Sequence, residues 1–150
     1  MQLRLVAVGT KMPAWVQQGY TGFATRMPRE CQLSLTEIPI ARKGRGATEE
    51  GERILAAVPQ KDLVVALEVT GRPWSTEQLA QQLENWRGSG RNVSLLIGGP
   101  DGLSDACRDR ADQKWSLSPL TFPHALVRII VAEQLYRAWT ILQNHPYHRP

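Results

Sequence analysis

The chain has 150 residues, a length at which we expect one compact domain over residues 1–150 with a single hydrophobic core. Hydrophobic residues make up 42% of the sequence and charged residues 21%, which excludes a disordered, coiled-coil or fibrous protein. The net charge of +4 favours a polyanionic partner without identifying it, and no apolar run is long enough to span a membrane. The first eight residues lack the features of a signal peptide, so we expect a soluble, cytoplasmic protein.

Short apolar segments alternate with amphipathic helical segments along the chain. Continuous or alternating apolar residues predict strands at 3–8, 33–38, 63–69, 93–97 and 115–117. Helical spacing predicts helices at 14–27, 48–57, 75–88, from 104 onward, and at 125–144. This order of elements predicts an α/β fold, with a mostly parallel sheet and helices on both of its faces.

The last predicted helix has more apolar surface than one face of a helix needs. Its apolar residues are Leu126, Val127, Ile129, Ile130, Val131, Leu135, Trp139, Ile141 and Leu142. A helix on the surface of a monomer would expose much of this area to water. The helix is therefore expected either to run through the middle of the fold or to pack against a second copy, and we favour a symmetric homodimer.

A glycine-rich turn, Gly98-Gly99-Pro100-Asp101-Gly102, follows the fourth predicted strand directly. Open α/β folds bind ligands at such turns, where glycine lets a ligand approach the backbone closely. No GK[ST] sequence follows, which excludes a P-loop, and the spacing does not match GxGxxG. By itself the turn is as consistent with a tight structural loop as with a cofactor-binding loop.

Two further segments carry side chains suited to catalysis. Thr121-Phe122-Pro123-His124 opens the last helix, which also contains Arg128 and Glu133, although a lone histidine at a helix start is more often a cap or a packed residue. The C-terminal segment 144–149 contains His145, Tyr147 and His148 without an accompanying carboxylate or cysteine, so we expect no metal site. This tail is expected to fold over a pocket or to fray.

A basic loop and two cysteines complete the candidate features. Arg42, Lys43 and Arg45 form a glycine-spaced basic loop, which is either a phosphate-binding segment or a solvated loop without a partner. Cys31 and Cys107 are far apart and neither belongs to a CxxC pair, so we expect two partly buried thiols and no disulfide.

Five segments of the sequence together resemble one known family. They are VAVGTK near the start, LLIGGPDGL in the middle, SLSPLTFPHALVR before the last helix, AEQLYRAW within it and HPYHR at the end. In this order and over the whole chain they closely resemble the ribosomal RNA large subunit methyltransferase H family of the SPOUT class. The region between Ile40 and Glu52 is shorter than in some relatives.

The resemblance implies a fold, a cofactor and a dimer. The implied fold is a SPOUT fold whose C-terminal segment forms a deep trefoil knot, a feature that rules on chain connection would not suggest. The implied cofactor is S-adenosylmethionine, and the dimer forms through the last helix. The cofactor-binding positions that match the family pattern are Leu67, Gly99, Ser118, Pro119, Leu120, Thr121, Phe122 and Pro123.

The reaction implied by the resemblance is methylation of N3 of a pseudouridine in 23S ribosomal RNA, on the assembled ribosome. The nitrogen starts out protonated, so His124, His148 and Glu133 are candidate bases, while Arg128 is a candidate to offset charge on the pyrimidine oxygens. Tyr147 and His148 are expected to close over the base. A non-enzymatic ribosome-binding or RNA-binding factor on the same fold is the alternative. A hydrolase or reductase would need a nucleophile elbow or a dinucleotide fingerprint, and the sequence contains neither.

Overall fold

The computed structural model describes residues 1–42 and 45–149. It contains one five-stranded sheet in the order β2-β1-β4-β3-β5, and every neighbouring pair of strands is parallel. The strands are β1 (Gln2–Val8), β2 (Gln32–Ile38), β3 (Leu63–Pro73), β4 (Val93–Ile97) and β5 (Gln113–Ser116). The helices are α1 (Ala14–Ala24), α2 (Gly46–Ala57), α3 (Thr76–Ser89), α4 (Asp105–Arg110) and α5 (His124–Leu142), with a 3₁₀ turn η1 (Arg29–Cys31). The predicted α/β class with a parallel sheet is confirmed.

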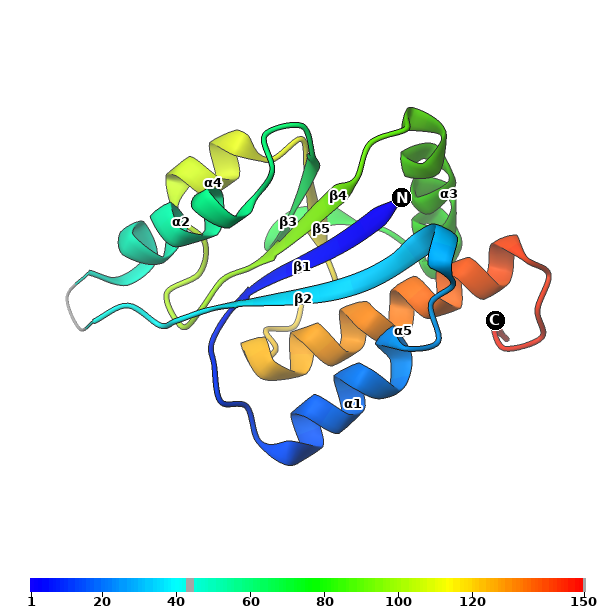
Figure 1. Cartoon of the computed structure of the whole chain (residues 1–150), viewed down its shortest axis with the longest axis horizontal. Coiled ribbons are helices and arrows are strands. Elements are labelled where there is room, and N and C mark those ends of the chain that lie inside the picture. Colours follow the sequence, from blue (N-terminus) through cyan, green and yellow to red (C-terminus); the bar gives the residue numbers. More distant parts are fainter. Residues whose placement is uncertain (43–44, 150) are drawn as a thin grey trace.

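Helices cover both faces of the sheet (Figure 1). Helices α1, α3 and α5 pack on one face, where Tyr20, Leu83 and Leu135 join a core cluster with Leu3, Leu5 and other strand residues. Helices α2 and α4 pack on the other face, where Ile54 and Cys107 join a second cluster. All five residues of β4 are buried, as the apolar run 93–97 predicts for a central strand covered on both sides.

Among the boundaries that differ from the expectation, those of α1 and β3 have identifiable causes. Helix α1 ends at Ala24, three residues earlier than predicted, because Thr25 caps it and the hydroxyl of Thr25 donates to the carbonyl of Thr21 at 2.8 Å. Strand β3 continues to Pro73, since its last residues pair with Trp115 and Ser116 of β5 after a register shift. Gly71 is required at this bend, because a Cβ there would lie 2.7 Å from the backbone carbon of Lys114.

Helix α5 lies against the sheet between α1 and α3, and none of its 19 residues is fully exposed. This arrangement explains much of the apolar surface that the sequence places on it. Leu126 and Ile130 are the exceptions, since both are only half-buried and belong to neither core cluster. They lie four residues apart and therefore share the outer face of the helix.

The structure tests the expectation that no segment spans a membrane, but it does not test the expected knot. Within residues 1–42 and 45–149, no helix combines the length and the apolar character that crossing a membrane requires. The trefoil knot and the single-domain organisation stay predictions.

Candidate active site

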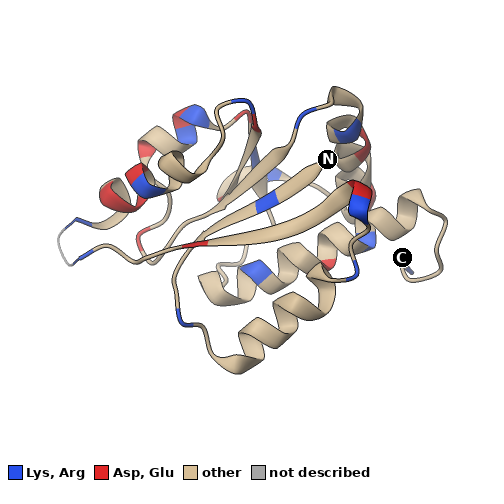
Figure 2. Cartoon of the chain, in the orientation of Figure 1, with Lys and Arg blue, Asp and Glu red and all other residues tan. Residues whose placement is uncertain are grey.

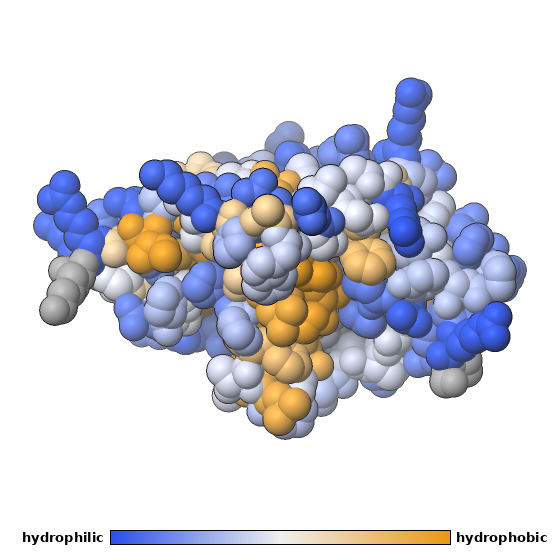
Figure 3. All heavy atoms as spheres, turned by 90° about the horizontal axis from the view of Figure 1, so that it is seen from below, coloured by the Kyte–Doolittle hydropathy of each residue, from blue (hydrophilic) through white to orange (hydrophobic). Residues whose placement is uncertain are grey.

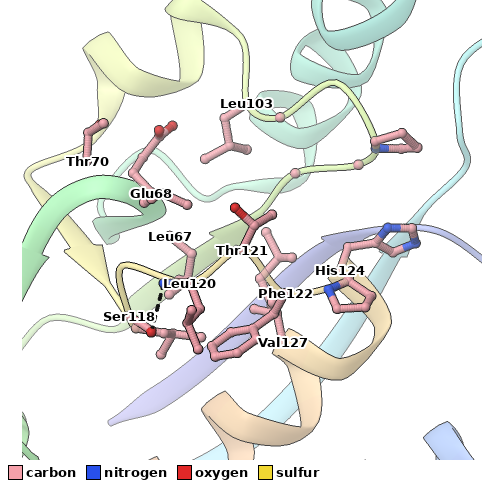
Figure 4. Close-up of a pocket in the computed structure, with 18 residues that line it drawn as sticks. Leu67, Glu68, Thr70, Leu103, Ser118, Leu120, Thr121, Phe122, His124 and Val127 are labelled. Carbon is pink, nitrogen blue, oxygen red and sulfur yellow. Dashed lines mark hydrogen bonds between the residues drawn. The ribbon is translucent and has the colours of Figure 1, made fainter.

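A cavity of about 440 Å³ lies at the carboxyl ends of the strands, where open α/β sheets bind their ligands. Four segments enclose it: the end of β3, the glycine turn after β4, the loop between β5 and α5, and the first turn of α5 (Figure 4). The residues that line it are Leu67, Glu68, Val69, Thr70, Ile97, Gly98, Gly99, Pro100, Gly102, Leu103, Leu117, Ser118, Leu120, Thr121, Phe122, Pro123, His124 and Val127.

The glycine turn forms one wall of this cavity and can close only with glycine. The N–H of Gly102 donates to the carbonyl of Gly99 at 3.0 Å, and Gly102 has a φ of +76°. A Cβ on Gly98 would lie 2.6 Å from the backbone carbon of Gly102. The two ends of the turn therefore approach each other more closely than any side chain allows, which brings bare backbone to the cavity wall.

The loop between β5 and α5 forms the opposite wall and is held in shape by its own serines. The hydroxyl of Ser116 donates to the carbonyl of Ser118 at 3.2 Å, and the N–H of Leu120 donates to the hydroxyl of Ser118 at 3.0 Å. This second bond is the dashed line in Figure 4. Leu120 is 68% exposed, so the loop presents an apolar side chain to both the cavity and the solvent.

Glu68 and Thr70 bring polar groups to the cavity from the end of β3. Glu68 accepts a hydrogen bond from Nε of Arg108 at 2.9 Å, and its side chain is only 13% exposed. The pair raises the pKa of the Arg108 guanidinium, which stays charged. A carboxylate held in this way can accept hydrogen bonds from hydroxyl or amino groups of a ligand.

His124 lies at the rim of the cavity. Arg128 lies near His124, beside Gly9, the residue that follows β1. A Cβ on Gly9 would lie 3.4 Å from Nε2 of His124 and 3.5 Å from Nη2 of Arg128. Arg128 is 1% exposed, and its Nη1 donates to Oε2 of Glu37 at 2.8 Å. Arg128 does not line the first cavity but lies behind it, in an ion pair that joins α5 to the end of β2.

The C-terminal tail folds back onto the far half of α5. The hydroxyl of Tyr147 donates to Glu133 at 2.8 Å, and Arg137 donates to the same carboxylate at 2.6 Å. Nε2 of His148 lies 3.0 Å from Oε1 of Glu77 at the start of α3. Burial, and then the bond to Glu133, raise the pKa of the Tyr147 hydroxyl, which therefore remains protonated at neutral pH.

The tail does not reach the cavity of the same chain. Tyr147 bonds to Glu133, nine residues after His124, and a helix rises 1.5 Å per residue, so about 14 Å of helix separates the two. Glu133 is engaged by Tyr147 and Arg137, which leaves His124 as the candidate base that lines the cavity.

Basic residues flank the loop between β2 and α2 on both described sides (Figure 2). Arg42 and Arg45 are exposed, and Lys43 lies outside the described residues. The carboxylate of Glu50, which is 2% exposed, accepts a hydrogen bond from the N–H of Ala41 at 2.9 Å and so anchors the start of this loop.

The structure thus brings most of the predicted site residues together. Seven of the eight predicted cofactor positions line one cavity with His124, whereas Pro119 is not among the lining residues. Arg128 lies next to the cavity, and Tyr147 and His148 lie apart from it. Sequence reasoning missed Glu68 and Thr70, although polar residues that end a buried strand are a recognisable signal.

Comparison with known proteins shows the family of this chain. The family model described as "Predicted SPOUT methyltransferase" matches residues 1–148. The proteins named "Ribosomal RNA large subunit methyltransferase H" from Hahella chejuensis and Methylococcus capsulatus are 61% and 57% identical to this chain. Each alignment covers 99% of the chain and 99% or 100% of the relative.

A solved structure shares the fold at low identity. The probable methylase family protein from Haemophilus influenzae Rd KW20 superposes with a TM-score of 0.61 at 15% identity, over 99% of this chain and 70% of that one. At this identity the likeness concerns the fold alone. The family model and the full-length relatives decide the assignment: the chain belongs to the SPOUT methyltransferase family, among the relatives named ribosomal RNA large subunit methyltransferase H.

Proposed function

We propose that this chain methylates N3 of a pseudouridine in 23S ribosomal RNA, using S-adenosylmethionine, and that it acts as a cytoplasmic homodimer on the assembled ribosome. The observation that carries this proposal is the convergence of the glycine turn, the loop 118–123 and His124 on one cavity. The relatives' printed names support ribosomal RNA as the substrate.

The cavity suits an S-adenosylmethionine molecule. Its volume of about 440 Å³ falls within the range of roughly 300–1,000 Å³ for small-molecule sites. Leu67, Leu103 and Leu117 offer apolar contact for an adenine ring, and the glycine turn offers backbone groups. Glu68 offers a carboxylate to hydroxyl or amino groups. S-adenosylmethionine would supply a sulfonium-bound methyl group, which passes to N3 as the carbon–sulfur bond breaks.

The chain's own task is to remove the proton from N3 and to hold the nitrogen in line with the methyl carbon. His124 is the candidate base, because its imidazole lies at the rim of the cavity and not within the tail network. Arg128, behind it, is positioned to stabilise negative charge on the pyrimidine.

The outer face of α5 supports the proposed dimer. Leu126 and Ile130 are half-buried outside both core clusters, Leu120 is 68% exposed and Trp15 is 59% exposed. Figure 3 shows apolar side chains gathered in one band on the side of the molecule that carries α1 and α5. An isologous two-fold contact through this band would cover it.

Such a contact would also explain how a tail that lies far from the cavity of its own chain could take part in the reaction. If two α5 helices pack antiparallel across Ile130, the partner's Tyr147 and His148 approach the cavity and not the far end of the helix. Each active site would then combine the cavity of one protomer with the tail of the other.

Mixed dimers test this arrangement. Two inactive homodimers, His124→Ala and Tyr147→Ala, are mixed and exchanged. A site shared between protomers restores about a quarter of wild-type activity, since half of the dimers are mixed and each of these has one intact site. No recovery, with exchange verified by mass, would place both residues in a single protomer and contradict the shared site.

The ribosome test addresses the substrate. The purified protein should methylate assembled ribosomes and leave naked 23S RNA nearly unmodified, because the exposed basic loop at Arg42 and Arg45 is a small footprint for RNA. Equal activity on both would reject the ribosome as the substrate. Binding to ribosomes without calorimetric binding of S-adenosylmethionine would favour the non-enzymatic factor.

A further inference from the structure

A second cavity, of about 320 Å³, lies next to the first and shares none of its lining residues. Lys11 comes to it from the loop after β1, Tyr20 from α1, Glu37 from the end of β2 and Arg128 from α5. The two cavities approach each other at Gly9, because His124 of the first and Arg128 of the second both lie near the position that its Cβ would take. A planar group bound in the second cavity would therefore lie close to His124, the proposed proton acceptor.

Two buried polar atoms in this cavity have no hydrogen-bond partner in the described protein. They are the hydroxyl of Tyr20, in a residue that is 7% exposed, and Nε of Arg128, in a residue that is 1% exposed. Leaving such an atom unsatisfied costs about 1–3 kcal/mol, so it indicates a group that a ligand satisfies. Burial raises the pKa of Tyr20, which leaves its hydroxyl protonated and able to donate.

The Arg128–Glu37 ion pair leaves one donor and one acceptor without a partner among the described residues. Nη1 of Arg128 is engaged with Oε2 of Glu37 at 2.8 Å, and Nη2 reaches the carbonyl of Gly9 at 3.4 Å. Nε of Arg128 remains as a donor, and Oε1 of Glu37 remains as an acceptor, since no bond to it is found among the described residues. A planar ligand that offers an acceptor to Arg128 and a donor to Glu37 would complement these two side chains.

The charged side chain at the mouth of the second cavity belongs to Lys11, whose backbone is strained. Lys11 is exposed and has a φ of 54°, in the left-handed region that residues with a side chain rarely adopt. Lys11 ends the VAVGTK segment, whose role the first cavity does not explain. A lysine at the entrance suits a ligand that is attached to a phosphate backbone.

We infer that the second cavity receives the base to be methylated, and that Glu37 and Arg128 read the ring edge that distinguishes pseudouridine from uridine. This inference rests on the proposed function. In pseudouridine the ribose is attached to a ring carbon, so N1 keeps its hydrogen beside the O2 carbonyl. Glu37 accepts from N1–H, the Arg128 guanidinium donates to O2, and N3, on the other side of O2, is left to face His124. In uridine N1 is bonded to the ribose, and this edge does not exist.

The test compares ribosomes that carry pseudouridine or uridine at the target position, prepared from cells with and without the enzyme that makes the pseudouridine. The wild-type protein should have a higher kcat/KM on pseudouridine. Glu37→Gln keeps an oxygen for Arg128 but can turn an amide donor toward N1–H, so the ratio of the two kcat/KM values should fall about tenfold or more. The matched control Glu52→Gln, at an exposed position on α2, should keep the wild-type ratio.

Tyr20→Phe provides a second test that does not depend on the ion pair. Its hydroxyl has no partner in the protein, so a purely structural role predicts equal or greater thermal stability and unchanged activity. A role in holding the base predicts a kcat/KM about threefold to tenfold lower, with unchanged melting temperature and unchanged calorimetric binding of S-adenosylmethionine.

The outcomes separate this inference from the proposed function. If the wild-type protein methylates neither ribosome, the proposed function fails, and the base-binding role fails with it. If the wild-type protein methylates pseudouridine ribosomes while Glu37→Gln keeps the ratio and Tyr20→Phe keeps the rate, the inference alone is overturned. A lower ratio for Glu37→Gln or a slower, equally stable Tyr20→Phe supports it.

Discussion

The amino and carboxyl ends of the sheet differ in whether their buried polar side chains have hydrogen-bond partners. At the amino end, Asp62 is 3% exposed and accepts hydrogen bonds from Arg4 at 3.0 Å and Ser94 at 2.7 Å. Among the described residues, the buried side-chain atoms without a partner belong to Tyr20, Glu49, Glu50 and Arg128. All four residues lie on helices that directly follow the carboxyl end of a strand.

This difference separates the part of the molecule that stabilises the fold from the part that meets a ligand. A buried carboxylate with its hydrogen-bond partners in place stabilises the native state, whereas buried polar atoms without partners lower stability until a ligand binds. Substitutions at the amino end should therefore lower stability and spare activity, and substitutions at the carboxyl end should do the reverse.

The largest effect is expected for His124→Ala at the carboxyl end. If His124 takes the N3 proton, kcat on assembled ribosomes should fall about 100-fold or more, while the melting temperature stays at the wild-type value. Single-turnover methyl transfer and thermal unfolding measure the two quantities. Wild-type kcat in this variant would remove His124 from the list of bases.

Asp62→Ala is the reciprocal test at the amino end. It leaves the buried Ser94 hydroxyl without its acceptor and Arg4 without its ion-pair partner, so the free energy of unfolding should fall by about 2–3 kcal/mol. The kcat/KM measured well below the melting temperature should be unchanged. Asp105→Ala is the matched control: its side chain is 96% exposed, so the change should be about 0.5 kcal/mol or less. A large loss of activity in Asp62→Ala would break the division between the two ends.

Two glycine substitutions sharpen the same division. Gly98→Ala places a Cβ 2.6 Å from the backbone of Gly102 and must distort the turn, so the Kd for S-adenosylmethionine should rise about tenfold. Gly88→Ala in α3 meets no atom within 4 Å and should leave this Kd unchanged while stabilising the helix by about 0.5–1 kcal/mol. Isothermal titration calorimetry and urea unfolding measure these effects, and equal Kd values for both variants would count against the glycine turn as cofactor wall.

The smallest effect concerns alkaline pH and Cys31, just before β2. Burial raises the pKa of the Cys31 thiol from 9.0 to about 11. The unfolded thiol therefore loses its proton first, and stability should be constant below pH 9 and fall as the pH rises from about 9 to 11. Cys31→Ala should show a shallower fall over this window in urea unfolding. Identical slopes for both proteins would show that Cys31 contributes nothing to it.

Several features of the fold followed from local signals. Apolar runs at 3–8 and 93–97 predicted β1 and β4, because a strand buried on both faces needs apolar residues at every position. The helix predicted from residue 75 begins there as α3, where Ser75 and Gln78 form both bonds of a capping box. The glycine turn was also visible directly after a predicted strand, although by itself it was as consistent with a structural loop as with a cofactor-binding loop.

The boundaries and some of the site were not predictable in this way. The extension of β3 to Pro73 depends on its pairing with β5, which lies about 40 residues further along the chain. Glu37 looked like an ordinary exposed residue of an alternating strand, and Tyr20 looked like one apolar position of a helix. Only their meeting with Arg128 gives either of them a possible chemical role.

By itself, the sequence determined the α/β order, the parallel sheet and the location of the glycine turn, since these depend on periodicity and turn chemistry within a few residues. The tertiary structure decided which distant side chains meet. Arg128 and Glu37 are 91 residues apart in the chain and form a bond of 2.8 Å, and the tail lies on Glu133 and not on His124. Such contacts are set by how whole helices pack on the sheet, and no local pattern specifies them.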